Sequence, residues 1–359
     1  MKVALDGMPL ASQLTGVGHY TFELARSLRL VAPDDEFTFV SPESPAAKFT
    51  QRWWSFGLPL YLVRSPFDLF HGTNYEIPIW SRLPSVLTIH DLSLFFHPEA
   101  HERRLVRRAR WRMPLMARLA TRIITPTLSV KNEVCEKFGL DSGKIAVTHE
   151  APRATFKRRE GSEAASVVKR LGIHDNFILF VGTVEPRKNL RRLLEAFDQV
   201  LRTTSLSQQL VIAGGQGWLM DDFQSVIKDK GLADHICLTG YLEDQDLSAL
   251  YSTCRVFVYP SVYEGFGLPP LEAMACGAPV IAARIAAIQE TLERAARLVD
   301  PLEVDELSQA LVEMLSDEQM REHYSRAGAE RVKKFTWEQT ALETLKVYRD
   351  VLSPRSWLN

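Results

Sequence analysis

Short apolar runs alternate with longer amphipathic segments along most of the chain. Runs such as FILFVG, LVIAGG and VFVYPS are apolar at consecutive positions, which is typical of strands buried on both faces of a parallel sheet. Helical patterns follow most of these runs, as NLRRLLEAFDQVLR follows FILFVG. This order of strand and helix predicts doubly wound α/β layers with parallel sheets.

The same pattern predicts six strands in each half of the chain. In the first half they lie near residues 2–6, 37–40, 68–71, 85–90, 122–125 and 144–148. In the second half they lie near residues 177–182, 209–213, 235–239, 255–259, 278–282 and 296–299. After residue 303 the pattern stays helical to near the end of the chain.

A polar and basic segment, 151–173, has no strand pattern and separates the two groups of strands. A chain of 359 residues also exceeds one typical hydrophobic core. We therefore expect two Rossmann-like domains, an N-terminal one at 1–160 and a C-terminal one at 170–335.

The composition is that of an ordinary soluble protein, with 46% hydrophobic and 24% charged residues. The N-terminus begins directly with a strand pattern, and no apolar run is long enough to cross a membrane, so we expect a cytoplasmic protein. The cysteines are scattered, which argues against a disulfide framework or a zinc site. They are Cys135, Cys237, Cys254 and Cys276.

The net charge of -1 conceals an asymmetry between the halves. Residues 1–160 hold 22 Lys and Arg against 16 Asp and Glu, whereas the remainder is acidic. Much of the basic charge lies in 101–122, where Leu105, Trp111, Met113 and Leu115 stand among arginines. This segment predicts either docking on an anionic membrane surface or a solvated helix face, and we expect Pro114 to interrupt or kink it. We expect no nucleic-acid partner.

Two turns that follow predicted strands carry anion-binding features. In QLTGVGHY, Gly16 and Gly18 allow a backbone to approach a phosphate at a helix start, although a plain tight turn fits equally well. In FVGTVEPRKNLRRLL, Arg187 and Lys188 directly precede a helix for which Asn189 is the expected N-cap. Cations there oppose the helix dipole unless an anion such as a diphosphate bridges them; the alternative is two solvated side chains in a loop.

A third turn, YEGFGLPPLEAMACGAPV, places Glu264 on a loop and Glu272 in the early part of a helix. Gly265 and Gly267 leave the intervening N–H groups available to a ligand, while carboxylates accept hydrogen bonds from sugar hydroxyls. The alternative is that Glu272 complements the helix dipole and Glu264 is solvated.

These motifs together resemble glycosyltransferase family 4. The two glutamates with seven residues between them resemble its signature, and GTVEPRKN, TGVGHYTFELA and TIHDLSLFFHPE resemble three further motifs in the expected order. The resemblance implies a GT-B fold, in which two Rossmann-like domains face each other across a cleft. It also implies that a final helix, about 336–359, returns to the N-terminal domain.

The resemblance further implies roles for residues of the second domain. Glu272 would bind the ribose of a sugar nucleotide, and Glu264 would contact the transferred sugar. Lys188 and Arg187 would neutralise the departing diphosphate. The amides of the intervening loop would face the sugar and the diphosphate; they belong to Gly265, Phe266, Gly267 and Leu268.

In the first domain, the resemblance implies that Gly16, Gly18 and the turn around them close over the diphosphate. His90 would approach the donor sugar as a polar orienter or proton helper. The alternative is that His90 has no such role and only forms a hydrogen bond with its neighbour Asp91. The implied reaction is metal-independent transfer of a hexose with retained configuration. The acceptor would be a glycan or lipid-linked hydroxyl, and GDP-mannose is the best single expectation for the donor.

The chain departs from the family pattern in three places. Thr183 stands where an arginine is common. Residues 286–290 read AAIQE and keep only Glu290 of a longer motif. His149 and Glu150 begin the stretch HEAP, where HNG is more familiar. Asp244 and Asp246 resemble helix caps more than a metal motif, so we expect no metal or cofactor.

Four other functions fit parts of the pattern. A sugar-nucleotide epimerase or a phosphorylase shares the architecture, but epimerases lack this set of glutamates and a phosphorylase is normally larger. A nicotinamide-dependent oxidoreductase needs a third glycine that TGVGHY lacks. A non-catalytic sugar-nucleotide-binding protein would keep the same residues, and only turnover separates it from an enzyme.

Overall fold

The computed structural model describes residues 1–11, 16–45, 47–159, 161–215 and 220–353. The chain forms two compact units. Unit 1 comprises Met1–Ala151 and Thr336–Asn359, and unit 2 comprises Pro152–Phe335. Each unit contains one six-stranded sheet in which every neighbouring pair of strands is parallel.

Unit 1 has the strand order β2-β1-β3-β4-β5-β6. Its strands are β1 (Lys2–Asp6), β2 (Glu36–Val40), β3 (Leu69–Gly72), β4 (Ser85–Thr88), β5 (Arg122–Thr125) and β6 (Ile145–Val147). Its helices are α1 (Gly16–Val31), α2 (Leu58–Arg64), α3 (Ser93–Phe96), α4 (Arg103–Leu119), α5 (Leu128–Phe138) and α14 (Trp337–Leu352).

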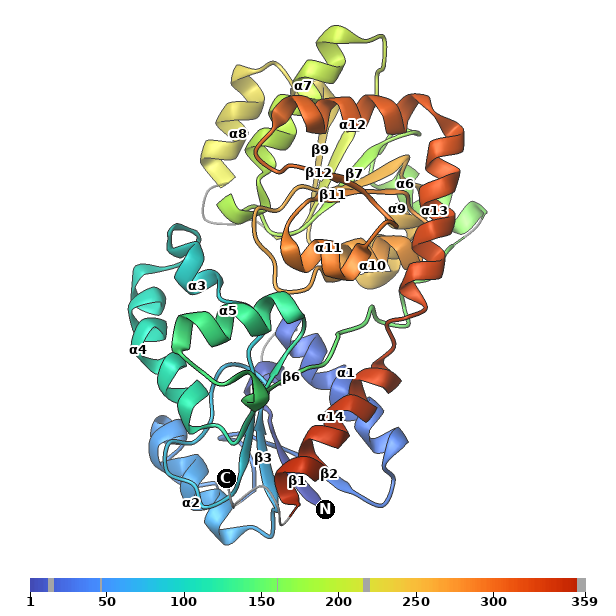
Figure 1. Cartoon of the computed structure of the whole chain (residues 1–359). Helices are drawn as coiled ribbons and strands as arrows, with labels where there is room; N and C mark the ends of the chain where they lie inside the picture. The colour runs from blue at the N-terminus through green and yellow to red at the C-terminus, as the bar shows by residue number, and fades with distance from the viewer. Residues whose placement is uncertain (12–15, 46, 160, 216–219, 354–359) are drawn as a thin grey trace. The chain divides into compact units, whose positions relative to one another are not determined.

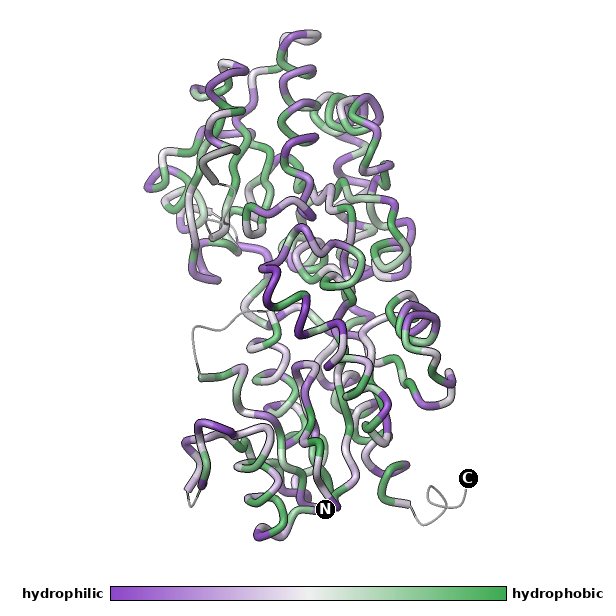
Figure 2. Tube along the Cα trace, turned by 90° about the vertical axis from the view of Figure 1, so that its left-hand side faces the viewer, coloured by the Kyte–Doolittle hydropathy of each residue, from purple (hydrophilic) through white to green (hydrophobic). Residues whose placement is uncertain are grey.

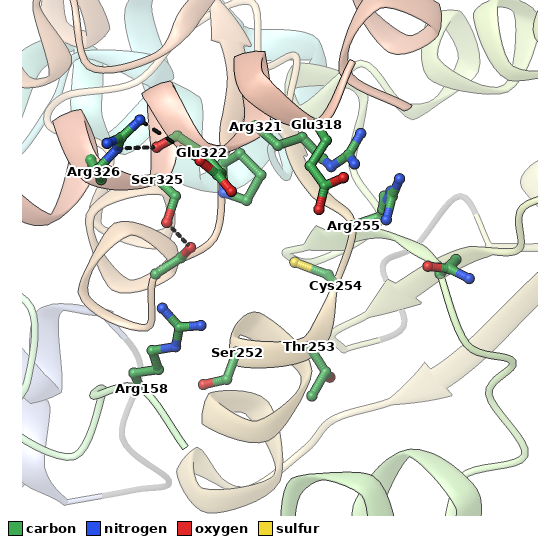
Figure 3. Close-up of a pocket in the computed structure, with 13 residues that line it drawn as sticks. Arg158, Ser252, Thr253, Cys254, Arg255, Glu318, Arg321, Glu322, Ser325 and Arg326 are labelled. Carbon is green, nitrogen blue, oxygen red and sulfur yellow. Dashed lines mark hydrogen bonds and ion pairs between the residues drawn. The ribbon is translucent and has the colours of Figure 1, made fainter. Parts of the chain in front are cut away.

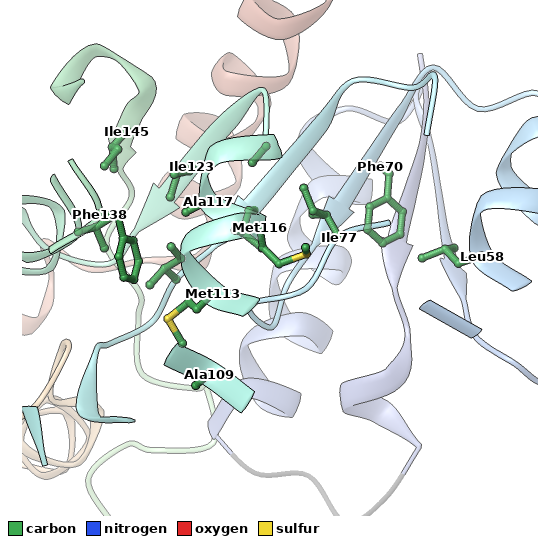
Figure 4. Close-up of a cluster of buried hydrophobic side chains, with 14 of the residues drawn as sticks. Leu58, Phe70, Ile77, Ala109, Met113, Met116, Ala117, Ile123, Phe138 and Ile145 are labelled. Atoms are coloured by element: carbon green, nitrogen blue, oxygen red, sulfur yellow. The ribbon is translucent and has the colours of Figure 1, made fainter. Parts of the chain in front are cut away.

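The apolar strands of unit 1 are buried because helices cover them. Figure 4 shows Met113 and Met116 of α4 in the same cluster as Phe70 of β3 and Ile123 of β5. Each fully buried side chain of this size contributes roughly 1.5–3 kcal/mol of transfer free energy. Helix α4 runs through Pro114, so an interruption of the helix there is wrong, while a kink stays a prediction.

The C-terminal helix α14 belongs to unit 1 and lies beside α1, as the red and blue helices in Figure 1 show. Trp337 of α14 lies 6.0 Å from the ring of Tyr20. The hydroxyl of Tyr348 lies 2.6 Å from Nδ1 of His71 on β3. These buried contacts explain why the helix packs on a sheet formed by residues far earlier in the chain.

Unit 2 has the strand order β12-β11-β10-β7-β8-β9. Its strands are β7 (Ile178–Val181), β8 (Leu210–Ala213), β9 (Ile236–Gly240), β10 (Val256–Tyr259), β11 (Val280–Ala283) and β12 (Arg297–Val299). Its helices are α6 (Ser162–Arg170), α7 (Leu190–Thr203), α8 (Met220–Asp229), α9 (Asp244–Thr253), α10 (Leu268–Ala275), α11 (Ala286–Leu292), α12 (Val304–Ser316) and α13 (Glu318–Val332).

The expected doubly wound α/β fold is confirmed, and each predicted strand has a counterpart within a few residues. In Figure 2 hydrophobic colour follows the strands inside each unit, while hydrophilic colour is frequent on the helices around them. Among the described residues, no helix combines the length and the apolar character that a bilayer crossing needs.

The division between the units falls at the start of the polar segment, after Ala151. The stretch that follows joins unit 2, whereas we expected the N-terminal domain to extend to residue 160. Two contacts explain this difference: Arg153 pairs with Asp244 at 2.6 Å, and Ser248 donates to the carbonyl of Lys157 at 2.9 Å.

Candidate active site

Two loops of the predicted site meet at one edge of the unit 2 sheet. Strands β7 and β10 are parallel neighbours, so the loops that follow them leave the sheet at the same end. The amide of Val262 donates to the carbonyl of Arg187 at 2.9 Å and joins the two loops. In parallel sheets this carboxyl edge is where ligands bind.

Lys188 and Glu264 form a buried ion pair between these loops. Nζ of Lys188 lies 2.7 Å from Oε1 of Glu264, and each side chain is 10% exposed. Nζ also donates to the hydroxyl of Tyr259 at 2.8 Å, and that hydroxyl donates to Glu264 at 2.7 Å. Tyr259 is the last residue of β10, so the rigid strand fixes both members of the pair.

Arg187 completes the cluster from the other side of Glu264. Its Nη1 lies 2.8 Å from Oε2 of Glu264, and its Nη2 lies 2.7 Å from Glu185. Burial acts to raise the pKa of Glu264, but the charges of Arg187 and Lys188 outweigh it and hold that pKa at about 2. Glu264 is therefore ionised, and the alternative of a solvated Glu264 is wrong.

Glu272 lies on α10 in a different environment. It is 7% exposed, and its carboxylate lies 3.5 Å from Nη2 of Arg153 and 3.5 Å from the hydroxyl of Tyr251. Burial raises its pKa to about 7, although Arg153 opposes the shift and the charge of Asp244 adds to it. The two signature carboxylates thus have separate partners, which removes the repulsion that their spacing suggests.

The backbone of the signature loop is held by a tight turn. Gly267 has φ of +97° at the N-terminus of α10, and a Cβ there would overlap Cδ1 of Ile288. Thr291 of α11 donates to the carbonyl of Phe266 at 3.1 Å, and the Phe266 ring packs on Phe335. The loop therefore has one well-defined course. Gly265 and Leu268 flank this turn.

Asn189 precedes α7 but does not cap it with its side chain. Its φ of +60° directs the side chain away from the helix, and its amide donates to the carbonyls of Pro260 at 3.0 Å and Pro301 at 2.6 Å. Asn189 therefore occupies the expected N-cap position, but its side chain joins two loops instead of capping the helix. This tie holds the segment containing Lys188 against the loop after β10.

His90 lies two residues beyond the end of β4 in unit 1. Its Nδ1 lies 2.9 Å from Oε1 of Glu150, and its Nε2 lies 2.9 Å from the carbonyl of Thr73. Asp91 instead accepts from the amide of Ser93 at 2.8 Å. The hydrogen-bonding partner of His90 is therefore Glu150, not the adjacent Asp91.

Gly16 and Gly18 lie in the first turn of α1, and Gly18 is buried. The remainder of the predicted phosphate-binding turn, residues 12–15, lies outside the described residues. Among the described residues, a Cβ added at Gly16 would meet no atom within 4 Å.

Asp244 and Asp246 are in the first turn of α9 rather than at its cap. Asp244 pairs with Arg153 and Asp246 pairs with Arg170, each at 2.6 Å. The cap position itself is Glu243. Both carboxylates thus pair with arginines of segment 151–173. No cluster of metal-binding side chains occurs among the described residues.

A separate polar cavity of about 500 Å³ lies at the opposite edge of the unit 2 sheet (Figure 3). Arg255, which directly precedes β10, lines it together with Arg158 and Arg321. Lys188 and Glu264 lie beyond the other end of β10. The cavity is thus distinct from the two loops that carry Lys188 and Glu264.

Both parts of the chain match known protein families. Residues 10–151 match the family described as Glycosyltransferase Family 4, and residues 165–331 match Glycosyl transferases group 1. The chain belongs to glycosyltransferase family 4. It is a transferase enzyme with the expected GT-B fold.

Relatives of this glycosyltransferase include bacterial mannosyltransferases. It is 29% identical to O-antigen chain mannosyltransferase B of Escherichia coli, over 97% of this chain and 100% of that protein. It is 27% identical to MMP alpha-(1->4)-mannosyltransferase of Mycolicibacterium hassiacum, over 81% of this chain and 72% of that protein.

Solved structures agree with the fold of the glycosyltransferase. Sucrose-phosphate synthase from Thermosynechococcus elongatus aligns with a TM-score of 0.76 and 21% identity, over 98% of this chain and 99% of that one. Anabaena HepE in complex with UDP and glucose aligns with a TM-score of 0.75 and 19% identity, over 98% and 100% of the two chains. At these identities the likeness concerns the fold alone.

Sequence reasoning did not assign four residues that contact the predicted site residues. Tyr259 contacts Lys188 and Glu264, Arg153 and Tyr251 contact Glu272, and Glu150 contacts His90. The available signals were a tyrosine at the end of an apolar strand, an arginine in the basic segment after residue 151, and a glutamate where the family pattern has asparagine.

Proposed function

We propose that the enzyme transfers a hexose from a nucleotide-diphosphate sugar with retention of configuration and without a metal ion. The observation that carries this proposal is the buried cluster of Lys188, Arg187 and Glu264 at the carboxyl edge of β7 and β10. Two cations at one sheet edge are suited to a diphosphate, and a carboxylate between them is suited to sugar hydroxyls.

Each residue of this edge has a role in the proposal. Lys188 and Arg187 stabilise the negative charge that develops on the departing diphosphate. Glu264 accepts hydrogen bonds from the transferred sugar, and the amides of 265–268 face the sugar and the diphosphate. Glu272 accepts from the ribose hydroxyls, for which it must be ionised.

The proposed reaction needs no protein nucleophile. The bond between the anomeric carbon and the phosphate oxygen breaks, and the electron pair stays on that oxygen. The acceptor oxygen forms the new bond on the same face, and its proton passes to the phosphate oxygen. Catalysis then rests on positioning and on charge stabilisation of the leaving group.

For unit 1 we propose that His90 orients the reacting groups, and that Gly16 and Gly18 allow the backbone to approach the diphosphate. The acceptor is a hydroxyl of a glycan or of a lipid-linked oligosaccharide. GDP-mannose is the proposed donor, because the mannosyltransferase relative from Escherichia coli aligns over almost the whole chain.

We further propose a cytoplasmic enzyme that contacts a membrane peripherally through α4. Leu105 and Trp111 are 48% and 58% exposed on this helix, and Arg103, Arg104 and Arg107 are exposed as well. Aromatic and aliphatic side chains among arginines favour the surface of an anionic bilayer. Met113 is in the core and has no part in this surface.

Thermal unfolding with a set of sugar nucleotides, in the presence of EDTA, tests the proposed donor site. The set comprises GDP-mannose, GDP-fucose, UDP-glucose, UDP-N-acetylglucosamine and dTDP-rhamnose, with NADH as a control. We expect GDP-mannose to raise the midpoint, since a ligand of the native state stabilises it by mass action. No shift with any sugar nucleotide, or a shift with NADH alone, would contradict the proposal.

Turnover separates an enzyme from a non-catalytic binder of the same ligand. We expect release of GDP from GDP-mannose when a mannose-containing glycan acceptor is added, at the same rate with and without EDTA. Loss of activity in EDTA that magnesium restores would overturn the metal-independent mechanism.

A further inference from the structure

A buried carboxylate contacts the one histidine that the proposed mechanism uses. Glu150 lies three residues beyond β6, and His90 lies two residues beyond β4. They are 60 positions apart in sequence, yet Oε1 of Glu150 lies 2.9 Å from Nδ1 of His90. Their side chains are 8% and 11% exposed. The pair is therefore built by the order of the strands.

The hydrogen-bond partners of His90 limit where its protons can be. Nε2 faces the carbonyl oxygen of Thr73, which can only accept, so Nε2 carries a proton. Nδ1 faces a carboxylate oxygen of Glu150, and this contact also needs a proton between the two atoms. Both ring nitrogens are therefore engaged, and neither has a lone pair available to an incoming hydroxyl.

The surroundings of His90 contain few other charges. Tyr20 of α1 and Tyr75 of the loop after β3 pack edge-on against the ring, with centroids 4.7 and 5.9 Å away. Asp91 contributes a more distant negative charge, and His71 of β3 contributes a ring that burial keeps neutral, with its pKa lowered to about 3. Burial acts to lower the pKa of His90, but its bond to Glu150 and the charge of Glu150 raise it above the usual value.

Building on the proposed function, we propose that Glu150 is a positioning residue that keeps His90 doubly protonated and fixed. The positive charge of His90 is then paired with the carboxylate of Glu150, and the ring does not accept a proton from the acceptor. The acceptor proton must accordingly leave with the diphosphate oxygen.

The first test measures the charge of His90 directly and needs no substrate. Nitrogen-15 NMR of the imidazole rings distinguishes a doubly protonated ring from either neutral tautomer. We expect both ring nitrogens of His90 to be protonated in the wild type at about pH 7. In Glu150→Gln we expect the titration midpoint of His90 to fall by about 1–3 pH units, because the opposite charge is lost.

The matched control is Glu99→Gln. Glu99 forms the exposed counterpart of the pair, 3.2 Å from Nδ1 of His97 and itself 62% exposed. It should leave the titration of His90 unchanged. A neutral His90 in the wild type at this pH, or equal midpoints for His90 in the wild type and in Glu150→Gln, would overturn the proposal.

The second test is the pH profile of transferase activity. Activity should be lost on the alkaline side at the pH where His90 titrates. That pH should be lower in Glu150→Gln than in the wild type, and it should be closer to the wild-type value in Glu150→Asp. An active Glu150→Gln enzyme with an unchanged profile would also overturn the proposal. If no sugar nucleotide turns over in the wild type, the proposed function fails, and the ring titration alone decides the role of Glu150.

The proposal can still be tested if the Glu150→Gln variant does not fold. If Glu150→Gln fails to fold, the protonation state of His90 in the wild type and in Glu150→Asp still decides whether the carboxylate holds the ring charged. A doubly protonated ring in both proteins supports the proposal. A neutral ring in either one contradicts it.

Discussion

Lys188 donates to Glu264 at 2.7 Å, and the two residues come from loops that follow neighbouring strands of one sheet. Tyr259, at the end of one of those strands, contacts both. Burial makes each charge depend on the other, because an isolated buried ion is strongly disfavoured. In the proposed reaction, the cation that neutralises the diphosphate is therefore held in place before the donor arrives.

Replacement of Lys188 by methionine should lower kcat by about 100–1000-fold, which is the usual cost of removing one group that stabilises transition-state charge. Glu264 keeps Arg187 and Tyr259 as partners, so the variant should remain folded. Steady-state kinetics with the donor that shifts the unfolding midpoint measures the effect.

Arg191→Ala provides the control for lost positive charge. This arginine is the second residue of α7, is 79% exposed and lies 3.5 Å from Glu195. Its kinetics should match those of the wild type. Equal activity of Lys188→Met and the wild type would remove Lys188 from the mechanism.

Donor affinity should increase as the pH rises through about 7. Burial raises the pKa of Glu272 to this value, and only the ionised carboxylate accepts hydrogen bonds from both ribose hydroxyls at full strength. Calorimetric titration with the donor between about pH 6 and pH 8 measures the change. In Glu272→Gln the affinity should be weaker and nearly independent of pH; a wild type with flat affinity over this range contradicts the ribose role.

The same carboxylate should influence stability with the opposite sign. Its folded pKa lies above the usual value of 4.5, so the unfolded chain binds fewer protons than the folded one between those two values. Glu272 therefore lowers stability increasingly as the pH rises from about 4.5 to about 7. Unfolding midpoints measured without ligand should show that the stability of Glu272→Gln increases relative to that of the wild type as the pH rises across this interval. A difference in midpoint that does not change with pH would indicate that the pKa of Glu272 is not raised.

Gly267→Ala should lower stability by about 1–3 kcal/mol and weaken donor binding. The residue has φ of +97°, and the added Cβ would overlap Cδ1 of Ile288. The double variant Gly267→Ala with Ile288→Ala removes the overlap and keeps the backbone strain, although it also leaves a cavity. Urea unfolding and donor titration of both variants separate the two causes.

Gly139→Ala supplies the comparison for backbone strain alone. Gly139 has φ of +64°, and a Cβ there would meet no atom of the described residues within 4 Å. If Gly267→Ala costs no more stability than Gly139→Ala and binds the donor normally, the tight turn of the signature loop has no special role.

Trp111→Ala should reduce binding to vesicles that contain anionic phospholipid by several-fold, because an exposed indole on a basic helix inserts at the bilayer interface. Co-sedimentation with vesicles, with and without anionic lipid, measures it. Trp80→Ala is the matched control, since Trp80 is 75% exposed outside any helix. Equal loss in the two variants, or binding that does not depend on anionic lipid, argues against docking through α4.

The sequence by itself determined the two sheets and the family, because both depend on short-range patterns. Apolar strands and amphipathic helices are defined over fewer than about 20 residues, and so is the signature that holds Glu264 and Glu272. The spacing of these glutamates also identified the loop and helix on which they lie. Those predictions need no knowledge of which strands become neighbours.

Only the tertiary structure decided which side chains meet. The pairs of Glu150 with His90 and of Arg153 with Glu272 span 60 and 119 positions, and they depend on strand order and on where the chain crosses between layers. Asp244 fits a helix cap by local preference, yet it lies in the first turn of α9 and pairs with Arg153 at 2.6 Å. Charge states followed from the same contacts, since burial and neighbouring charges set a pKa and neither can be read along the chain.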